Sequence, residues 1–252
     1  VAKGIEREIN TIIIMPTENS ENFRERCRGA GVAYIALAIS RITKEPLAAF
    51  KYLLFSISEV FKITHLLKHG NFDLIHVSGG SWQYKGLIAG RLAGIKVIWH
   101  LNDTSMPWFF RKIFYLLNPL ADGFIFASHR SLKYYDSIIS DKKNSAIIPA
   151  PVDTNKFNPN KICLSNDTLS GKFVIGTVAN VNPVKGLEIF IQAAAYLNID
   201  IKNAYFVVIG EVFNRQKKYY KSLLNLCNEL SVDNIKFISG VSDVRPLLSR
   251  FD

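Results

Sequence analysis

Residues Val174–Ala193 read VIGTVANVNPVKGLEIFIQA, and this stretch decides the fold. Its apolar beginning predicts a strand, its asparagine and proline residues predict a tight loop, and an amphipathic helix is expected to begin at Lys185-Gly186. The first backbone N–H groups of a helix have no partner inside the helix and attract anions, and a neighbouring lysine adds positive charge. The stretch therefore predicts a strand–loop–helix unit of an α/β protein with a binding site for an anion, usually a phosphate.

Strand-like apolar runs alternate with helical patterns along the rest of the chain, which is typical of βαβ units and parallel sheets. The expected strands are Asn10–Met15, Gly31–Ala36, Leu74–Val77, Val97–His100, Gly123–Ala127, Ala146–Ile148, Phe173–Val178, Tyr205–Ile209 and Ile235–Ile238. The expected helices are Leu47–Lys68, Ser81–Ala93, Trp108–Leu117, Leu187–Leu197 and Gln216–Leu230. The predicted fold class is α/β, with two Rossmann-like, doubly wound parallel sheets in series. A ligand is expected in the cleft between them, at the carboxyl ends of the strands.

The segment Asp153–Ser170 has a loop composition and divides the chain into two predicted domains, residues 1–158 and 171–252. Both ends of the chain read as interrupted. Residues 1–9 have the pattern of a helix end, so the first domain is expected to lack the opening strand of a doubly wound sheet. Phe251-Asp252 stop where a further strand should begin, so the second sheet is expected to be incomplete.

The chain of 252 residues is 48% hydrophobic, enough for a packed core, and carries a formal net charge of +10. A basic chain suits nucleic acid, anionic lipid or a phosphorylated substrate, but no nucleic-acid-binding motif is visible. No apolar run reaches the length of about 18 residues that a membrane span needs, and no secretory signal is visible. The 3 cysteines are too widely spaced for a metal site or a disulfide framework. A cytoplasmic protein without nucleic-acid partners or a bound metal is therefore expected.

Several motifs follow one another in a fixed order along the chain. They are Asp73–His76 (DLIH), Gly86–His100, Ala121–Ser128 (ADGFIFAS), residues 148–159 (IPAPVDTNKFNP) and Val174–Ala193. Each is weak alone, but together they resemble the retaining nucleotide-sugar glycosyltransferases of family four (group 1), which have the two-domain GT-B fold. The resemblance implies an enzyme that moves a sugar from a nucleoside diphosphate sugar to a glycan or lipid-linked acceptor, without a metal or other cofactor. It also implies an acceptor-binding first domain, a nucleotide-binding second domain and a place in bacterial surface-polysaccharide assembly.

The resemblance assigns a diphosphate clamp to the second domain. In the family, a Gly-Arg pair and a Lys-Gly pair hold the donor diphosphate. Here Lys185 and Gly186 match the second pair, while Asn180 occupies the arginine position. These three residues are therefore predicted to bind the donor.

Two further loops of the second domain match donor-binding loops of the family. Gly210-Glu211 has the form of a step beside the donor, although a simple turn explains the pair equally well. Gly240 and Val241 lie in the loop that is implied to meet the nucleotide base. The family's Glu-x7-Glu motif, which holds the sugar and ribose, does not occur in the chain, so the chain by itself is expected to be inactive.

His100 ends a very apolar strand and is the predicted catalytic residue. The matching histidine of the family lies near the reacting centre and contacts the donor sugar, whereas the alternative interpretation is a structural histidine at a strand end. Gly79, Gly80 and Asp103 are the predicted acceptor-side residues. A tight strand-to-helix turn explains the two glycines equally well.

The segment Met106–Leu117 mixes aromatic residues with Arg111 and Lys112, and the expected helix Leu47–Lys68 is also basic and amphipathic. Such helices lie in a bilayer interface with their cations towards anionic lipid, so peripheral contact with the inner face of a membrane is one interpretation. The other is an ordinary core-packing face with solvated charges.

Two rival functions stay open at this point. A GT-B-fold sugar-nucleotide epimerase uses the same donor but needs no acceptor. A membrane-surface or partner-binding module keeps the fold and has lost the diphosphate clamp, an interpretation that Asn180 suggests. The sequence does not identify the donor base, the sugar or the acceptor.

Overall fold

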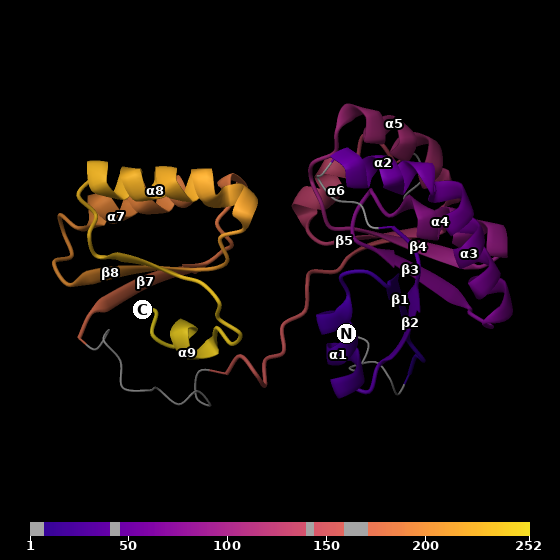
Figure 1. The fold of residues 1–252 in the computed structure, drawn as a ribbon, viewed down its shortest axis with the longest axis horizontal. Coiled ribbons are helices and arrows are strands. Elements are labelled where there is room, and N and C mark those ends of the chain that lie inside the picture. The colour runs from indigo at the N-terminus through magenta and orange to yellow at the C-terminus, as the bar shows by residue number, and fades with distance from the viewer. Residues whose placement is uncertain (1–7, 41–45, 140–143, 159–170) are drawn as a thin grey trace. The chain divides into compact units, whose positions relative to one another are not determined.

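The computed structural model describes residues 8–40, 46–139, 144–158 and 171–252. The chain divides into two compact units, Val1–Pro151 and Val152–Asp252 (Figure 1). Residues 152–158, which the sequence pattern groups with the first domain, belong by their contacts to the second unit. There the backbone oxygen of Lys156 accepts a hydrogen bond from Arg245 Nη1 at 3.4 Å.

The strands of the first unit form two parallel sheets. They are β1 (Ile12–Pro16), β2 (Ala33–Leu37), β3 (Leu74–Ser78), β4 (Lys96–Leu101), β5 (Gly123–Phe126) and β6 (Ser145–Ile147). β1 pairs with β2, and a second sheet has the order β3-β4-β5-β6. The predicted parallel α/β class is confirmed, but no described strand joins β1 to β3, so the expected single sheet appears as two.

The helices of the first unit differ from the prediction at two places, one interruption and one later start. They are α1 (Glu21–Gly29), α2 (Pro46–Leu54), α3 (Ser56–His69), α4 (Tyr84–Ala93), α5 (Trp108–Leu117) and α6 (His129–Tyr135). The expected helix Leu47–Lys68 is interrupted at Phe55, where the hydroxyl of Ser56 donates to the backbone oxygen of Tyr52 at 2.6 Å. The helix expected from Ser81 begins only at Tyr84, because Gly79 and Gly80 first make a turn with positive φ.

The core of the first unit surrounds the inner strands β4 and β5. Trp99 on β4 is fully buried and contacts Phe114 of α5, with ring centres 4.7 Å apart. α4 packs on β3 and β4, between α3 and α5. A Cβ at Gly90 of α4 would lie 2.5 Å from a methyl carbon of Val97, so the absence of a side chain allows the helix to approach the sheet closely.

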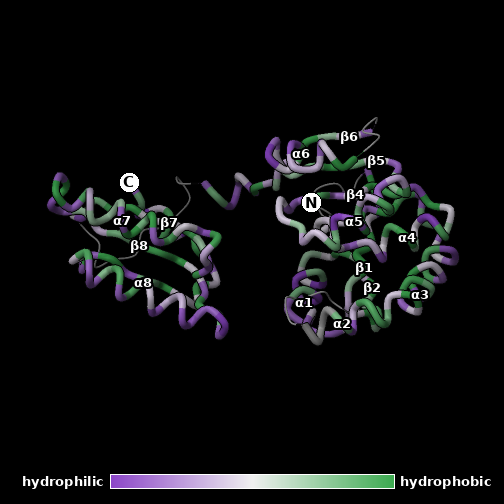
Figure 2. The backbone as a smooth tube through the Cα atoms, turned by 90° about the horizontal axis from the view of Figure 1, so that it is seen from above, coloured by the Kyte–Doolittle hydropathy of each residue, from purple (hydrophilic) through white to green (hydrophobic). Residues whose placement is uncertain are grey.

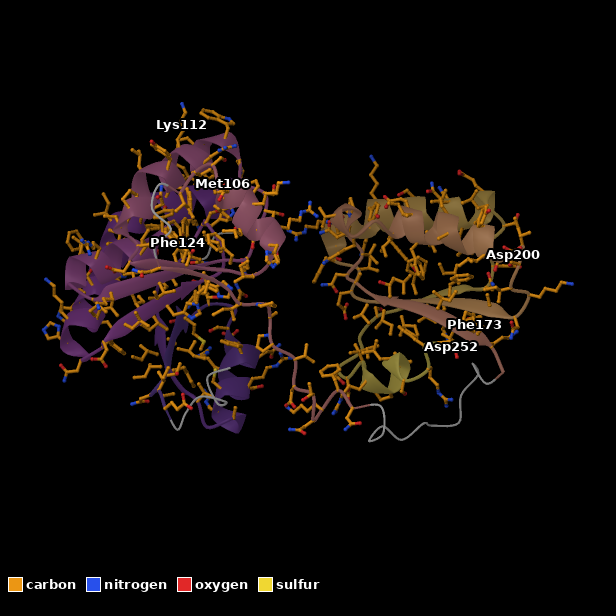
Figure 3. All side chains as sticks on the ribbon, turned by 180° about the vertical axis from the view of Figure 1, so that it is seen from behind. Met106, Lys112, Phe124, Phe173, Asp200 and Asp252 are labelled. Carbon is orange, nitrogen blue, oxygen red and sulfur yellow. The ribbon has the colours of Figure 1, made fainter. Side chains whose placement is uncertain are left out.

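The second unit has one parallel sheet, β7-β8-β9, with helices on both faces. Its strands are β7 (Phe173–Val178), β8 (Ala204–Ile209) and β9 (Ile235–Ile238), and its helices are α7 (Leu187–Leu197), α8 (Lys217–Glu229) and α9 (Arg245–Leu248). α7 and α8 cover one face and α9 lies on the other (Figure 1). The middle strand β8 is largely hydrophobic, as its green colour in Figure 2 shows, and is buried almost throughout. Asp252 returns to the edge of β7, where its N–H donates to the backbone oxygen of Val174 at 2.9 Å (Figure 3).

Candidate active site

Three loops of the second unit are joined by hydrogen bonds at the carboxyl ends of the strands. Asn180 follows β7, Glu211 follows β8 and Gly240 follows β9. Asn180 Oδ1 accepts a hydrogen bond from the N–H of Glu211 at 3.0 Å, and Glu211 Oε1 accepts one from the N–H of Gly240 at 2.8 Å. The structure therefore brings together three of the predicted donor-binding residues. The asparagine at the arginine position ties two loops together.

Gly210 is the point of closest approach between two of these loops. A Cβ built there would lie 2.2 Å from the backbone oxygen of Ala179 and 2.7 Å from the nitrogen of Asn180. The N–H of Gly210 donates to the backbone oxygen of Ile238 at 2.9 Å. The residue is thus more than a simple turn, since a larger residue would displace the loop that carries Asn180.

Lys185 lies in a short turn before the helix and does not open it, whereas the predicted helix Leu187–Leu197 has the expected bounds. Pro183–Lys185 form a single 3₁₀ turn, Gly186 adopts the left-handed conformation with φ 64°, and α7 begins at Leu187. Asn182 Oδ1 supports the turn by accepting from the N–H of Val184 at 3.2 Å. The side chain of Lys185 is exposed and has no ion-pair partner within the described residues, so its charge is available to an anion.

Gly240 and Val241 have different surroundings although they are neighbours. Gly240 adopts φ 72° and gives its N–H to Glu211. Val241 is half-buried and packs against the cluster formed by Val174, Val207 and Ile209. Gly240 therefore links this loop to the loop after β8 by a hydrogen bond, while Val241 packs on the apolar face of the sheet.

In the first unit, His100 at the end of β4 contacts a second histidine on β3. His100 Nδ1 lies 3.2 Å from His76 Nε2, and the ring planes are inclined by only 12°. His100 Nε2 is buried and has no hydrogen-bond partner among the described residues. The sequence pattern contains His76 in the Asp73–His76 motif, but the prediction did not give it a role.

Both histidines are held in the neutral form. Burial lowers the pKa of His100 below its ordinary value. Burial, and after it the neighbouring His100, lowers the pKa of His76. Two neutral imidazoles therefore meet through their ring nitrogens at the carboxyl edge of the sheet.

Two of the predicted acceptor-side residues, Gly79 and Gly80, form a turn beside His100, and the carboxylate of the third, Asp103, lies against this turn. Gly79 and Gly80 have φ 125° and 89°, and the N–H of Gly80 donates to the backbone oxygen of His100 at 3.2 Å. The indole N–H of Trp99 donates to the backbone oxygen of Gly80 at 3.1 Å. A Cβ at Gly80 would lie 2.8 Å from the carboxyl carbon of Asp103. The glycines thus allow the turn to lie against this carboxylate.

The carboxylate of Asp103 is used to hold this turn. Asp103 Oδ2 accepts a hydrogen bond from Ser81 Oγ at 3.0 Å, and Oδ1 accepts one from the hydroxyl of Tyr135. Burial, and then the hydrogen bond to Asp103, raises the pKa of Tyr135, so its hydroxyl stays protonated and donates. This arrangement orients the turn next to His100.

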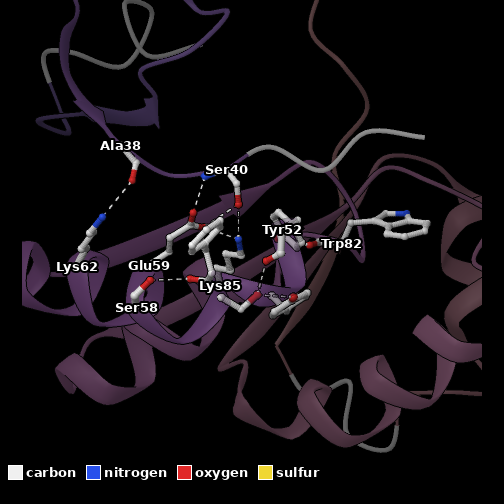
Figure 4. A network of polar contacts seen from close by, with 11 residues as sticks. Ala38, Ser40, Tyr52, Ser58, Glu59, Lys62, Trp82 and Lys85 are labelled. Carbon is white, nitrogen blue, oxygen red and sulfur yellow. Dashed lines mark hydrogen bonds and ion pairs between the residues drawn. The ribbon is translucent and has the colours of Figure 1, made fainter. Parts of the chain in front are cut away.

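A buried ion pair joins α3 to α4, next to the segment that precedes α4 (Figure 4). Glu59 of α3 and Lys85 of α4 are each about 4% exposed, and Lys85 Nζ contacts Glu59 Oε2. Glu59 Oε1 accepts from the backbone N–H of Ser40 at 2.7 Å, which fixes the segment after β2. The hydroxyl of Tyr52 donates to the backbone oxygen of Trp82 at 2.8 Å, which fixes the segment before α4. Burial lowers the pKa of Lys85, although its hydrogen bond with Glu59 opposes this shift.

Within the described ranges, no group of three histidine, cysteine or carboxylate side chains is placed to hold a metal ion. Among the described helices, none has the length and apolar character to cross a bilayer.

Comparison with known proteins places the chain in a family. Residues 2–156 match the family described as Glycosyltransferase Family 4, and residues 165–252 match the one described as Glycosyl transferases group 1. The chain is 27% identical over 223 residues to an Escherichia coli UDP-Gal:alpha-D-GlcNAc-diphosphoundecaprenol alpha-1,3-galactosyltransferase, an alignment that covers 79% of this chain and 58% of the relative. The chain therefore spans a little more than half the length of that protein.

Two solved structures have the same fold. Anabaena HepE in complex with UDP and glucose has a TM-score of 0.76 and 18% identity, covering 100% of this chain and 67% of HepE. A glycosyltransferase from Rickettsia africae has a TM-score of 0.76 and 16% identity, covering 100% of this chain and 65% of that protein. These likenesses agree with the predicted pair of Rossmann-like units of the GT-B type. Because the first family match alone extends over more than half of the sequence, the chain belongs to glycosyltransferase family 4.

Proposed function

We propose that this chain forms the substrate-binding part of a retaining, metal-independent glycosyltransferase that moves a sugar from a UDP-sugar to a glycan or lipid-linked acceptor. The observation that carries the proposal is the contact chain Asn180–Glu211–Gly240 at the carboxyl ends of three parallel strands, with the exposed Lys185 in the same loop as Asn180. UDP appears in the names of both the HepE complex and the Escherichia coli relative, which supports uracil as the donor base.

The proposed chemistry assigns separate tasks to the two units. As the bond between the sugar and the diphosphate breaks, negative charge builds on the departing phosphate oxygen. Lys185 Nζ and the backbone N–H groups at the start of α7 would stabilise this charge, which is the task that a divalent cation performs elsewhere. His100 would donate a hydrogen bond to an oxygen of the donor sugar. Retention of the anomeric configuration rests on the resemblance to retaining members of the family.

A sugar-nucleotide epimerase is separated from a transferase by its products. We expect the intact protein to give a glycosylated acceptor only when an acceptor glycan or lipid is added. An altered nucleotide sugar formed without any acceptor would identify the epimerase. A membrane-surface or partner-binding module is the other rival, because Asn180 stands where the family's diphosphate clamp has an arginine. Vesicle binding without nucleotide binding would support this module.

Lys185→Ala in the intact protein is expected to weaken UDP binding by about 1.5–3 kcal/mol, because a hydrogen bond between a charged lysine and a phosphate is lost. Isothermal titration calorimetry with UDP measures this loss. Lys202→Ala is the matched control, since Lys202 is exposed but precedes β8, at the amino end of the strands. An equal effect of both substitutions, or none from either, would exclude Lys185 from the diphosphate site.

Peripheral contact with an anionic membrane is part of the proposal and is supported by the surface of α5. Trp108 and Leu116 are both 73% exposed, and the ten residues of the helix include no acidic side chain. Arg111 and Lys112 accompany them, and Lys112 points away from the sheet (Figure 3). Aromatic and basic side chains on one helix suit the boundary between lipid headgroups and acyl chains. The proposed location is therefore the cytoplasm, at the inner face of a membrane.

Replacing both cations of α5, in Arg111→Gln/Lys112→Gln, is expected to weaken binding to vesicles that contain phosphatidylglycerol by about 2 kcal/mol, at about 1 kcal/mol for each charge. Co-sedimentation with these vesicles and with phosphatidylcholine vesicles measures the effect. Lys217→Gln/Lys218→Gln on α8 removes the same charge from exposed positions of the second unit and serves as the control. If both double variants lose affinity equally, the contact depends on net charge and not on α5.

A further inference from the structure

Two histidines from neighbouring strands meet at the carboxyl edge of the first unit's larger sheet. β3 and β4 pair so that Ser78 is opposite His100, and His76 lies two residues before Ser78. Residues two apart on a strand point to the same face, so His76 and His100 are diagonal neighbours on one face of the sheet. Their nearest ring nitrogens, His76 Nε2 and His100 Nδ1, are 3.2 Å apart.

The two rings lie edge to edge, in nearly one plane. Their centres are 5.3 Å apart and their planes differ by 12°. At this distance between the ring centres, the two nitrogens can approach to 3.2 Å only when both lie almost on the line that joins the centres. The N–H of one ring therefore points at the lone pair of the other, which is the geometry of a direct hydrogen bond.

The direction of this hydrogen bond fixes the proton position on both rings. If His76 Nε2 donates, both rings carry their proton on Nε2, which is the intrinsically favoured tautomer of neutral histidine. If His100 Nδ1 donates, both rings must adopt the less favoured tautomer. The hydrogen bond made by one ring nitrogen determines the state of the other nitrogen.

We propose that His76 is a positioning residue for His100: its Nε2–H donates to His100 Nδ1 and thereby makes His100 Nε2 a hydrogen-bond donor for an oxygen of the donor sugar. The hydrogen bond from His100 Nε2 to the sugar rests on the proposed function, whereas the tautomer of His100 is a property of the protein without ligand.

The described part of the protein leaves His100 Nε2 for a ligand. The atom is buried and has no partner within the described part of the chain. A buried N–H without a partner destabilises the free protein, so it gains most from an acceptor that arrives with a ligand. Burial also lowers the pKa of both histidines, which keeps each ring neutral and each hydrogen-bonding role defined.

The tautomer is measured by ¹⁵N NMR of histidine-labelled protein without any substrate, because protonated and bare ring nitrogens differ strongly in chemical shift. We expect His100 to carry its proton on Nε2 in the wild type. In His76→Leu, which cannot donate, we expect the share of the Nδ1–H form of His100 to rise above that of the wild type, although Nε2–H is the intrinsically favoured tautomer. In His76→Gln, the side-chain amide can donate to His100 Nδ1 and should restore the Nε2–H form. Thermal unfolding of each variant shows whether it is folded.

Transfer kinetics provide the second measurement. His76→Leu should lower kcat by about 10–100-fold, the loss typical when an orienting partner of a histidine is removed, with little change in KM for the UDP-sugar. His76→Gln should recover most of this loss. A wild-type His100 protonated on Nδ1, or a tautomer that His76→Leu leaves unchanged, would overturn the proposal. If the wild type transfers no sugar, the proposed function fails, whereas the tautomer measurement still decides the role of His76.

Discussion

His100→Ala is expected to lower kcat of the intact transferase by about 10²–10³-fold, the usual effect of removing one hydrogen-bond donor from a reacting centre. The melting temperature should change little. The described contacts of the His100 side chain include one hydrogen bond, to His76, and its other ring nitrogen has no partner. The residue also lies outside the buried cluster around Trp99.

Steady-state transfer assays and thermal unfolding, run side by side, measure both effects. His129→Ala is the control, since His129 is exposed at the first position of α6. We expect this variant to match the wild type in both measurements. A His100→Ala protein that melts much earlier, but whose folded fraction keeps full kcat, would identify His100 as a structural histidine.

Glu59→Ala is expected to lower the free energy of unfolding of the first unit by about 3–5 kcal/mol, because it leaves the Lys85 ammonium buried without its partner. The loss also removes the acceptor of the Ser40 N–H. Urea titration followed by tryptophan fluorescence is selective for this unit, because all 3 tryptophans of the chain are Trp82, Trp99 and Trp108.

Glu59→Leu/Lys85→Met should recover much of the lost stability, because replacing both charges with apolar side chains removes the unpaired ammonium. Glu21→Gln is the surface control. It breaks the ion pair between the exposed carboxylate of Glu21 and Arg24, and should lower the free energy of unfolding by at most about 1 kcal/mol. If Glu59→Ala costs no more than this control, the buried pair does not stabilise the unit.

The sequence predicts the elements well where local pattern decides them. The run of apolar residues in β7 and the helical spacing of apolar residues in α7 are both evident from the sequence. The predicted helix Leu187–Leu197 matches α7, but Lys185 lies in a 3₁₀ turn before it, and Gly186 in the left-handed conformation separates that turn from the helix. The helix α6 was not predicted, although Ser128 and Ser131 form a capping box that marks its start.

The contacts of the candidate site depend on partners that are distant in sequence. Glu59 and Lys85 each read as solvated charges on a helix, and no periodicity shows that α3 and α4 turn them towards each other. His76 and His100 come together only through the pairing of β3 with β4. Asn180 was identified by its position in a motif, but its hydrogen bond to the backbone of Glu211 required the sheet order.

The tie between the three loops of the second unit has a consequence for the entropy of ligand binding. Asn180 joins the loop after β7 to the loop after β8, and Glu211 joins that loop to the one after β9. The first two of these loops also pack closely, since a Cβ at Gly210 would clash with the backbone of Ala179 and Asn180. A ligand that binds to preorganised loops does not have to order them, so more of its contact energy appears as affinity. The loops are therefore ordered when the unit folds, before any ligand binds.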